Sequence, residues 1–360
     1  MAIGSRENVK GRHVLQVGRT PTGLSWATSR RRLCVDLRVS APIGVFDSGV
    51  GGLSVLRDIR RELPAEDLIY VADSAQAPYG DKPAGLVQAR ALALVEFLLV
   101  QEAKAVVVAS NTATGMAVEA LRARYDVPIV AIEPAVKPAV ARTRSGVVGV
   151  IATTQTLSGP KYARLVRAHA DGVRVVAQPC PGLVDRVEAG DLSSPETRAL
   201  VEQYVRPLVE QGADTIVLGC THYPFLSEAI QAAAGPGVDV IDSAVPVARE
   251  VRRRLAAAGL LAPETGQGRE WFWTTGDPGQ VESVVAQLWP GAVDVQAVPV
   301  AREVRRRLAV AGLLAPETGR GREWFWTTGD PGQVESVVAQ LWDGAVDVQA
   351  VPEPFAWSAV

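Results

Sequence analysis

The feature that most constrains this chain is an internal correspondence over a shift of 110 positions, which aligns residues 98–110 with residues 208–220. In both segments the end of a helix is followed by a short polar turn, an apolar strand and a small residue. Ligands of open α/β sheets bind beyond the carboxyl ends of the strands. The correspondence therefore predicts two related halves whose strand ends share one site.

The later segment ends in a cysteine that is closely followed by a histidine. Thr215–Leu218 has the apolar and β-branched pattern of a buried parallel strand, and Cys220 and His222 follow it. A thiol and an imidazole this close, where backbone N–H groups open the next helix, favour an activated thiolate. A buried cysteine is otherwise a small hydrophobic residue. The first half carries Ser110 at the position of Cys220.

Composition excludes several classes of protein. The net charge of -2 leaves no basic surplus for phosphates, so direct nucleic-acid binding is not expected. The three cysteines (Cys34, Cys180 and Cys220) form no CxxC pair, which argues against a disulfide framework or a zinc site and favours the cytoplasm. No apolar run approaches the roughly 20 residues of a membrane helix.

Strand and helix patterns alternate along the chain with short linkers. This order predicts an α/β protein with two pseudo-symmetric, doubly wound lobes of mostly parallel sheets and an active site between them. Expected strands are Ile43–Phe46, Leu68–Ala72, Ile129–Ile132, Val147–Ile151, Val173–Ala177 and Val238–Ile241. Expected helices are Leu53–Arg61, Leu86–Leu99, Lys161–His169, Ser194–Glu210 and Phe225–Ala233.

The predicted domains follow from these patterns and from changes in composition. Residues 1–41 have eight basic and two acidic side chains and are expected to be a disordered extension, with a basic arm for nucleic acid or membrane as the alternative. Residues 42–133 with 246–298 are the expected first lobe, and residues 134–245 the second. Residues 352–360 are a tail.

The last hundred residues contain a tandem duplication. Residues 299–351 repeat residues 246–298 with three differences: Ala257 against Val310, Gln267 against Arg320, and Pro290 against Asp343. Each copy predicts a basic helix (Val247–Ala258 in the first), a strand with two tryptophans and a helix capped by an Asp-Pro pair. We interpret one copy as completing the fold and the other as surplus. The two copies either compete for one docking surface, or the surplus copy docks onto a second protomer.

Two turns in the first half suit ligand binding. Asp47–Gly52 is a glycine-rich turn between a strand and a helix, where a ligand can approach the backbone and the helix N-terminus favours an anion. A capped helix start, with Asp47 or Ser48 bonding backbone amides, is the alternative. In Pro78-Tyr79-Gly80 the proline fixes a turn and the glycine permits an unusual backbone angle, which would hold Tyr79 in place.

Six motifs together make the chain similar to glutamate racemases of the aspartate/glutamate racemase superfamily, over roughly Pro42 to Val298. They are F-D-S-G-x-G-G (Phe46–Gly52), P-Y-G (Pro78–Gly80), V-x-x-N-T-A (Val108–Ala113), E-P-A-V-K-P (Glu133–Pro138), G-C-T-H-Y-P (Gly219–Pro224) and T-G-D-P (Thr275–Pro278). The resemblance implies racemisation of L- and D-glutamate without a cofactor or metal, which supplies D-glutamate for peptidoglycan. It also implies a cytoplasmic protein, which we expect to be a homodimer.

The resemblance also implies roles for individual residues. Cofactor-free inversion of an α-carbon needs one base on each face, and in the family both bases are cysteines. Cys220 would act on the face of the L-enantiomer with His222 assisting, and Asp47 would assist the opposite base at position 110. Binding of the substrate's amino and carboxylate groups would fall to Asp47, Ser48, Tyr79, Gly80, Asn111, Thr112, Thr221 and His222.

Ser110 is the departure from the family pattern. A hydroxyl has a pKa roughly 5 or more units above that of a thiol, which adds on the order of 7 kcal/mol to forming the base on that face. We therefore expect impaired racemisation, while Cys220 still exchanges the α-proton of L-glutamate with solvent. Two alternatives stay open: a binding or regulatory protein without catalysis, for which DNA gyrase is a partner by family analogy only, and a racemase or isomerase of another small acid.

Overall fold

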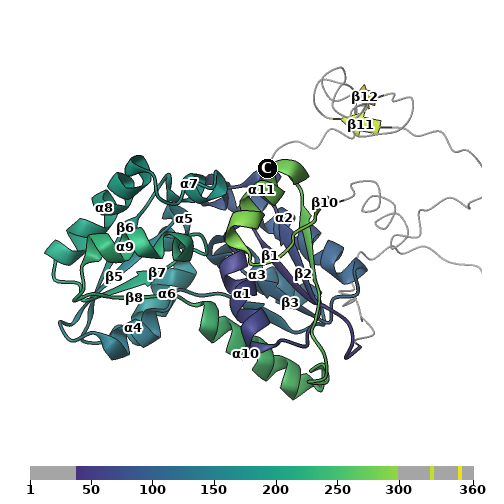
Figure 1. Ribbon diagram of the computed structural model, residues 1–360, viewed down its shortest axis with the longest axis horizontal. Coiled ribbons are helices and arrows are strands. Elements are labelled where there is room, and N and C mark those ends of the chain that lie inside the picture. The colour runs from purple at the N-terminus through teal and green to yellow at the C-terminus, as the bar shows by residue number, and fades with distance from the viewer. Residues whose placement is uncertain (1–37, 299–324, 328–347, 351–360) are drawn as a thin grey trace, which may run out of the picture. The chain divides into compact units, whose positions relative to one another are not determined.

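The computed structural model describes residues 38–298, 325–327 and 348–350 (Figure 1). The first lobe is built on a six-stranded sheet in the order β10-β9-β2-β1-β3-β4, in which all neighbouring strands run parallel. Its strands are β1 (Ile43–Asp47), β2 (Leu68–Ala72), β3 (Ala105–Val108), β4 (Ile129–Ala131), β9 (Glu270–Thr274) and β10 (Val295–Ala297).

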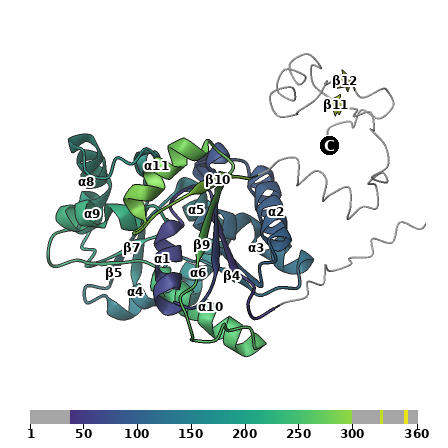
Figure 2. The ribbon, with the colours of Figure 1, turned by 45° about the vertical axis from the view of Figure 1, so that its right-hand side comes forward.

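Helices cover both faces of this sheet (Figure 2). Alternate strand residues face opposite ways: Ile43 and Val45 pack in one apolar cluster and Phe46 in another. The first cluster holds residues of α1 (Leu53–Glu62), α10 (Ala244–Ala258) and α11 (Pro278–Leu288), and the second those of α2 (Ala84–Val100) and α3 (Asn111–Arg124). Burial on both faces explains why these strands read as continuous apolar runs.

The second lobe is built on a four-stranded parallel sheet in the order β6-β5-β7-β8. These strands are β5 (Val147–Ala152), β6 (Arg174–Pro179), β7 (Thr215–Leu218) and β8 (Asp239–Ile241). The accompanying helices are α4 (Val136–Arg142), α5 (Thr154–Ser158), α6 (Pro160–His169), α7 (Leu183–Glu188), α8 (Pro195–Glu210) and α9 (Ser227–Ala234). Three short 3₁₀ turns complete the lobes: η1 (Ser74–Gln76), η2 (Tyr79–Asp81) and η3 (Tyr223–Leu226).

The predicted fold class, with two mostly parallel sheets, is confirmed. Helices α4, α5 and α7 were not predicted, and two of the predicted helices start differently from expectation. The helix predicted over Phe225–Ala233 is a 3₁₀ turn, η3, followed by α9, and α10 begins at Ala244, so that Pro246 lies in the first turn, where its missing N–H costs no hydrogen bond. None of the helices in the described ranges is both long and apolar enough to cross a bilayer.

The duplicated block is partly described. In the first copy β9 joins the sheet beside β2, and Trp289 is buried while Trp271 and Trp273 are half-buried. In the second copy β11 (Phe325–Thr327) and β12 (Val348–Ala350) form a parallel pair. The predictions for residues 1–37, for the rest of residues 299–351 and for the tail lie outside the described residues.

Candidate active site

The strand ends of the two lobes meet at one small cavity. Ser110 follows β3 and Cys220 follows β7, and both line it. The aligned positions that defined the internal correspondence therefore face one space. Of the residues predicted from the sequence, all but Asp47 line the cavity: Ser48, Tyr79, Gly80, Ser110, Asn111, Thr112, Cys220, Thr221 and His222. Thr153, Thr156 and Val184 of the second lobe were not predicted and also line it.

Cys220, His222 and Glu188 form a connected chain. The Sγ of Cys220 lies 3.6 Å from Nδ1 of His222, and Nε2 of His222 lies 2.6 Å from Oε1 of Glu188. Burial by itself lowers the pKa of His222, but the hydrogen bonds to Cys220 and Glu188 outweigh it and hold that pKa well above its usual value. The ring therefore carries a positive charge, and its Nδ1 lies within hydrogen-bond distance of the sulfur of Cys220.

The glycine-rich turn after β1 makes room for this chain of side chains. A Cβ on Gly49 would lie 1.8 Å from Oε1 of Glu188, and one on Gly51 would lie 2.3 Å from Nδ1 of His222. The amide of Val50 donates to the same Glu188 oxygen at 2.8 Å. The Val50 amide of the glycine-rich turn therefore binds the carboxylate of Glu188. We had expected this turn to bind an anionic ligand.

Asp47 is fully buried beneath the cavity and does not line it. Its carboxylate accepts from the Thr221 hydroxyl at 2.8 Å and from the Ser48 amide at 2.7 Å. Burial raises the pKa of Asp47, and the positive charge of His222 acts against that rise. Asp47 does not cap α1, whose N-cap, Gly52, makes no side-chain hydrogen bond. It instead connects the end of β1 to the turn after β7.

Ser110 has a structural role at the start of α3. Its side-chain oxygen accepts a hydrogen bond from the Ala113 amide at 3.3 Å, so Ser110 is the N-cap of that helix. The residue is 4% exposed and faces the cavity. Among the described residues, no hydrogen bond joins it to Asp47, its expected assistant.

Tyr79 is held by a carboxylate that sequence reasoning did not assign to the site. Its hydroxyl donates to Asp73 at 2.5 Å, and Asp73 also accepts from Thr275 at 2.7 Å and from Arg90. Burial and the charge of Asp73 raise the pKa of Tyr79. Because its hydroxyl is engaged, Tyr79 shapes the wall of the cavity through its backbone and ring.

Gly80 corrects the expectation of an unusual backbone angle. Its φ lies outside the left-handed region, and the residue belongs to the 3₁₀ turn η2. A Cβ here would lie 3.1 Å from Cβ of Thr153. Glycine at this position therefore permits close approach of the second lobe.

Beside Gly80, threonine hydroxyls of the two lobes form hydrogen bonds with each other. Oγ1 of Thr112 lies 3.1 Å from that of Thr153 and 3.2 Å from that of Thr156. Thr153 follows β5, the neighbour of β7, and caps α5, so its place at a strand end was a signal that could have found it. Asn111 is 7% exposed, and its Oδ1 has no hydrogen-bond partner within the described part of the chain. This acceptor suits an ammonium group.

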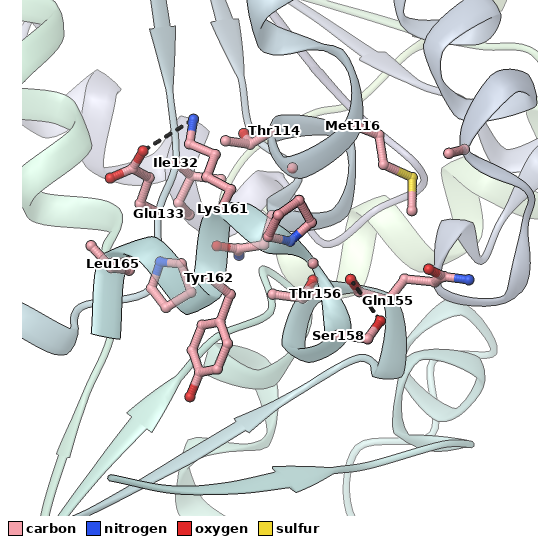
Figure 3. Close-up of a pocket in the computed structure, with 16 residues that line it drawn as sticks. Thr114, Met116, Ile132, Glu133, Gln155, Thr156, Ser158, Lys161, Tyr162 and Leu165 are labelled. Carbon is pink, nitrogen blue, oxygen red and sulfur yellow. Dashed lines mark hydrogen bonds and ion pairs between the residues drawn. The ribbon is translucent and has the colours of Figure 1, made fainter. Parts of the chain in front are cut away.

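A larger cavity of about 330 Å³ adjoins the site and shares Asn111 and Thr156 with it (Figure 3). Its walls are mostly apolar, and Lys161 pairs with Glu133 at 3.1 Å on its lining. Neither Cys220 nor Ser110 reaches it. We therefore assign the chemistry to the smaller cavity.

Comparisons with known proteins place the chain in a family. The profile of the Asp/Glu/hydantoin racemase family matches residues 43–251. The glutamate racemase of Methylococcus capsulatus is 53% identical over 258 residues, which cover 72% of this chain and 95% of that protein. The glutamate racemase of Pseudomonas aeruginosa PAO1 is 53% identical over 252 residues, which cover 69% of this chain and 94% of that protein.

Solved structures give the same result. Glutamate racemase isoform RacE1 of Bacillus anthracis has a TM-score of 0.67 and 34% identity, over 72% of this chain and 98% of its own. Glutamate racemase of Escherichia coli, solved with L-glutamate and the activator UDP-MurNAc-Ala, has a TM-score of 0.62 and 30% identity, over 71% of this chain and 97% of its own. The chain belongs to the Asp/Glu/hydantoin racemase family, among its glutamate racemases.

Proposed function

We propose that this chain binds glutamate in the small cavity and moves its α-proton through Cys220, with inversion to D-glutamate limited by Ser110. The observation that carries the proposal is the Cys220–His222–Glu188 chain, which enters the same cavity as Ser110. The D-glutamate formed would serve peptidoglycan synthesis. A homodimer is the expected assembly.

The proton transfer follows from the charges around Cys220. His222, held protonated by its hydrogen bonds to Cys220 and Glu188, would stabilise a thiolate at Cys220, and the thiolate would remove the α-proton of bound L-glutamate. Asn111 would accept from the substrate's ammonium group. Ser48 and Thr112 would donate to its carboxylates, together with the backbone amides at the start of α3. The Thr221 hydroxyl, which donates to Asp47 in this structure, would donate to a substrate carboxylate once that bond shifts.

The opposite face offers only the Ser110 hydroxyl. Its pKa is roughly 5 or more units above that of a thiol, so forming a base there costs on the order of 7 kcal/mol more than at a cysteine. Returning the proton from Cys220 to the same face regenerates L-glutamate. Exchange of the α-proton with solvent should therefore outpace racemisation by several orders of magnitude.

Substrate entry requires movement, because the cavity has a free volume of about 10 Å³, which is room for roughly one water molecule. Interlobe hydrogen bonds, such as that from Thr221 to Asp47, must break or shift for glutamate to enter. Lobe opening is therefore part of the proposed cycle.

The test is incubation of the protein with L-glutamate in D₂O, followed by NMR for α-deuterium and circular dichroism for D-glutamate. We expect deuterated L-glutamate from the natural chain, and racemisation raised by up to roughly 10⁵-fold in Ser110→Cys. Equal racemisation by the two proteins would show that the hydroxyl is a sufficient base. No exchange by either protein would reject Cys220 as the base.

A glutamate-binding protein without turnover is the second candidate, because Ser110 already serves as a helix cap. Calorimetric binding of L-glutamate, without label exchange in the natural chain or in Ser110→Cys, would identify it. A binding partner such as DNA gyrase belongs only to this candidate.

A further inference from the structure

The first copy of the duplicated block completes the first lobe. Its strand β9 pairs with β2 in the register Tyr70↔Phe272, and its helix α10 packs on α1. Phe272 is 4% exposed, and its ring lies against those of Tyr70 and Trp289. Thr275, just beyond β9, donates to Asp73, which in turn holds Tyr79 in the cavity wall. Residues 246–298 thus contribute both to the sheet and to the residues that hold the site.

The three differences between the copies avoid this interface. Ala257, Gln267 and Pro290 are all exposed in the first copy. Every first-copy residue that is buried against the lobe therefore recurs unchanged in residues 299–351. The second copy carries a complete set of the docking side chains.

The second copy also repeats the strand pairing of the first. Phe272 pairs with Val295 in β9 and β10, and Phe325 pairs with Val348 in β11 and β12, which is the same register 53 positions later. In the first copy the other edge of this pair joins β2. Among the described residues β11 and β12 form a two-stranded sheet.

We infer that the first lobe accepts residues 299–351 in place of residues 246–298 of the same chain. The displaced first copy then forms a loop between Val245 and Pro299. Thr328 takes the place of Thr275 beside Asp73, so the cavity wall is rebuilt. The occupant is the same chain, because a tethered segment acts at an effective concentration near millimolar, above that of a second molecule in dilute solution.

Closure of the loop sets the balance between the two states. The buried contacts are the same, but the exchanged state closes a loop of 53 residues, whereas the surplus second copy closes none. The probability of closing a loop falls as the 3/2 power of its length, which for this loop gives a preference of roughly 400-fold for the first copy. A substitution that weakens docking of the first copy should therefore lead the second copy to dock in its place.

Substitutions at equivalent positions test the exchange in the full chain. Phe272→Asp places a charge in the buried contact with Tyr70, and Phe325→Asp does the same in the second copy. We expect Phe325→Asp to melt like the natural chain, Phe272→Asp to keep a cooperative transition at a lower Tm, and the double variant to lose that transition. A Phe272→Asp protein that is as unfolded as the double variant would overturn the inference.

Disulfide trapping identifies the docked copy directly. Asp67 lies beside β2 and accepts from the Arg269 amide at 2.8 Å, and Arg322 is the equivalent of Arg269. With Cys34, Cys180 and Cys220 changed to serine, Asp67→Cys/Arg269→Cys is the control for an intrachain disulfide. In the Phe272→Asp chain, we expect Asp67→Cys/Arg322→Cys to form an intrachain disulfide. A disulfide-linked dimer, or no disulfide, would refute exchange within one chain.

Discussion

At the scale of single residues, Glu188 connects the two lobes at the site. One carboxylate oxygen accepts from the Val50 amide of the first lobe and lies 2.6 Å from Nε2 of His222 in the second. The positive charge of His222 beside Cys220 therefore depends in part on the carboxylate of Glu188. Glu188 was not predictable from the sequence because it lies 34 positions before His222, within an ordinary amphipathic helix.

Glu188→Gln tests this dependence. The amide keeps the size of the side chain but removes the negative charge, so the pKa of His222 should fall and the thiolate should become less stable. We expect α-proton exchange to drop by at least about 10-fold, with its pH profile displaced. Glu202→Gln, at an exposed position of α8, is the matched control and should exchange at the natural rate.

The raised pKa of His222 also makes stability depend on pH. A histidine whose pKa is higher in the folded than in the unfolded state, near 6.5, stabilises the fold fully below about pH 6.5. This contribution is lost as the pH rises through the folded-state pKa. Urea unfolding of the natural chain and of His222→Asn should differ most below pH 6.5 and progressively less above it. A gap that widens with rising pH would contradict this assignment.

At the scale of elements, the glycine-rich turn after β1 packs closely against Glu188 and His222, where we had expected it to contact a ligand. Gly51→Ala should push the His222 ring away, because the new Cβ would meet it at 2.3 Å. We expect exchange to fall by at least about 10-fold, with a lower Tm. Gly115→Ala, inside α3 with no atom within 4 Å of the added Cβ, should instead gain about 1 kcal/mol of stability from helix propensity.

A buried ion pair joins the segments that precede two strands. Lys104, before β3, lies 2.5 Å from Glu66, before β2, and both residues are almost fully buried. Lys104→Met leaves a buried carboxylate without its partner, and we expect it to cost about 3–5 kcal/mol of unfolding free energy. Lys137→Met, at an exposed position, should change stability little. Denaturant titration compares the two.

Most elements were predictable from the sequence because their signals are local. The apolar run of β7 and the Asp277 cap of α11 predict the observed strand and helix start. The contacts of Gly80 and Tyr79 were not predictable in the same way. Thr153 and Asp73 reach these residues from other elements, and only the packed lobes bring them together.

At the scale of the whole molecule, the site depends on the bonds between the lobes. The Ser54 hydroxyl donates to the Thr221 carbonyl at 2.9 Å, and the Thr221 hydroxyl donates to buried Asp47. Thr221→Val leaves one Asp47 oxygen without this donor, which should cost about 1–3 kcal/mol and raise the pKa of Asp47 further. Thermal unfolding at several pH values measures both effects. An unchanged Tm would show that the bond adds nothing to lobe association.

The first lobe is discontinuous, since β9 completes its sheet only after the second lobe has been traversed. During synthesis the edge of β2 therefore has no β9 to pair with while residues 134–245 emerge from the ribosome. Translation at about 5–20 residues per second then delivers residues 246–298 roughly 3 to 10 s before their duplicate. The order of synthesis thus favours pairing of the first copy with β2, as the loop-closure equilibrium also does.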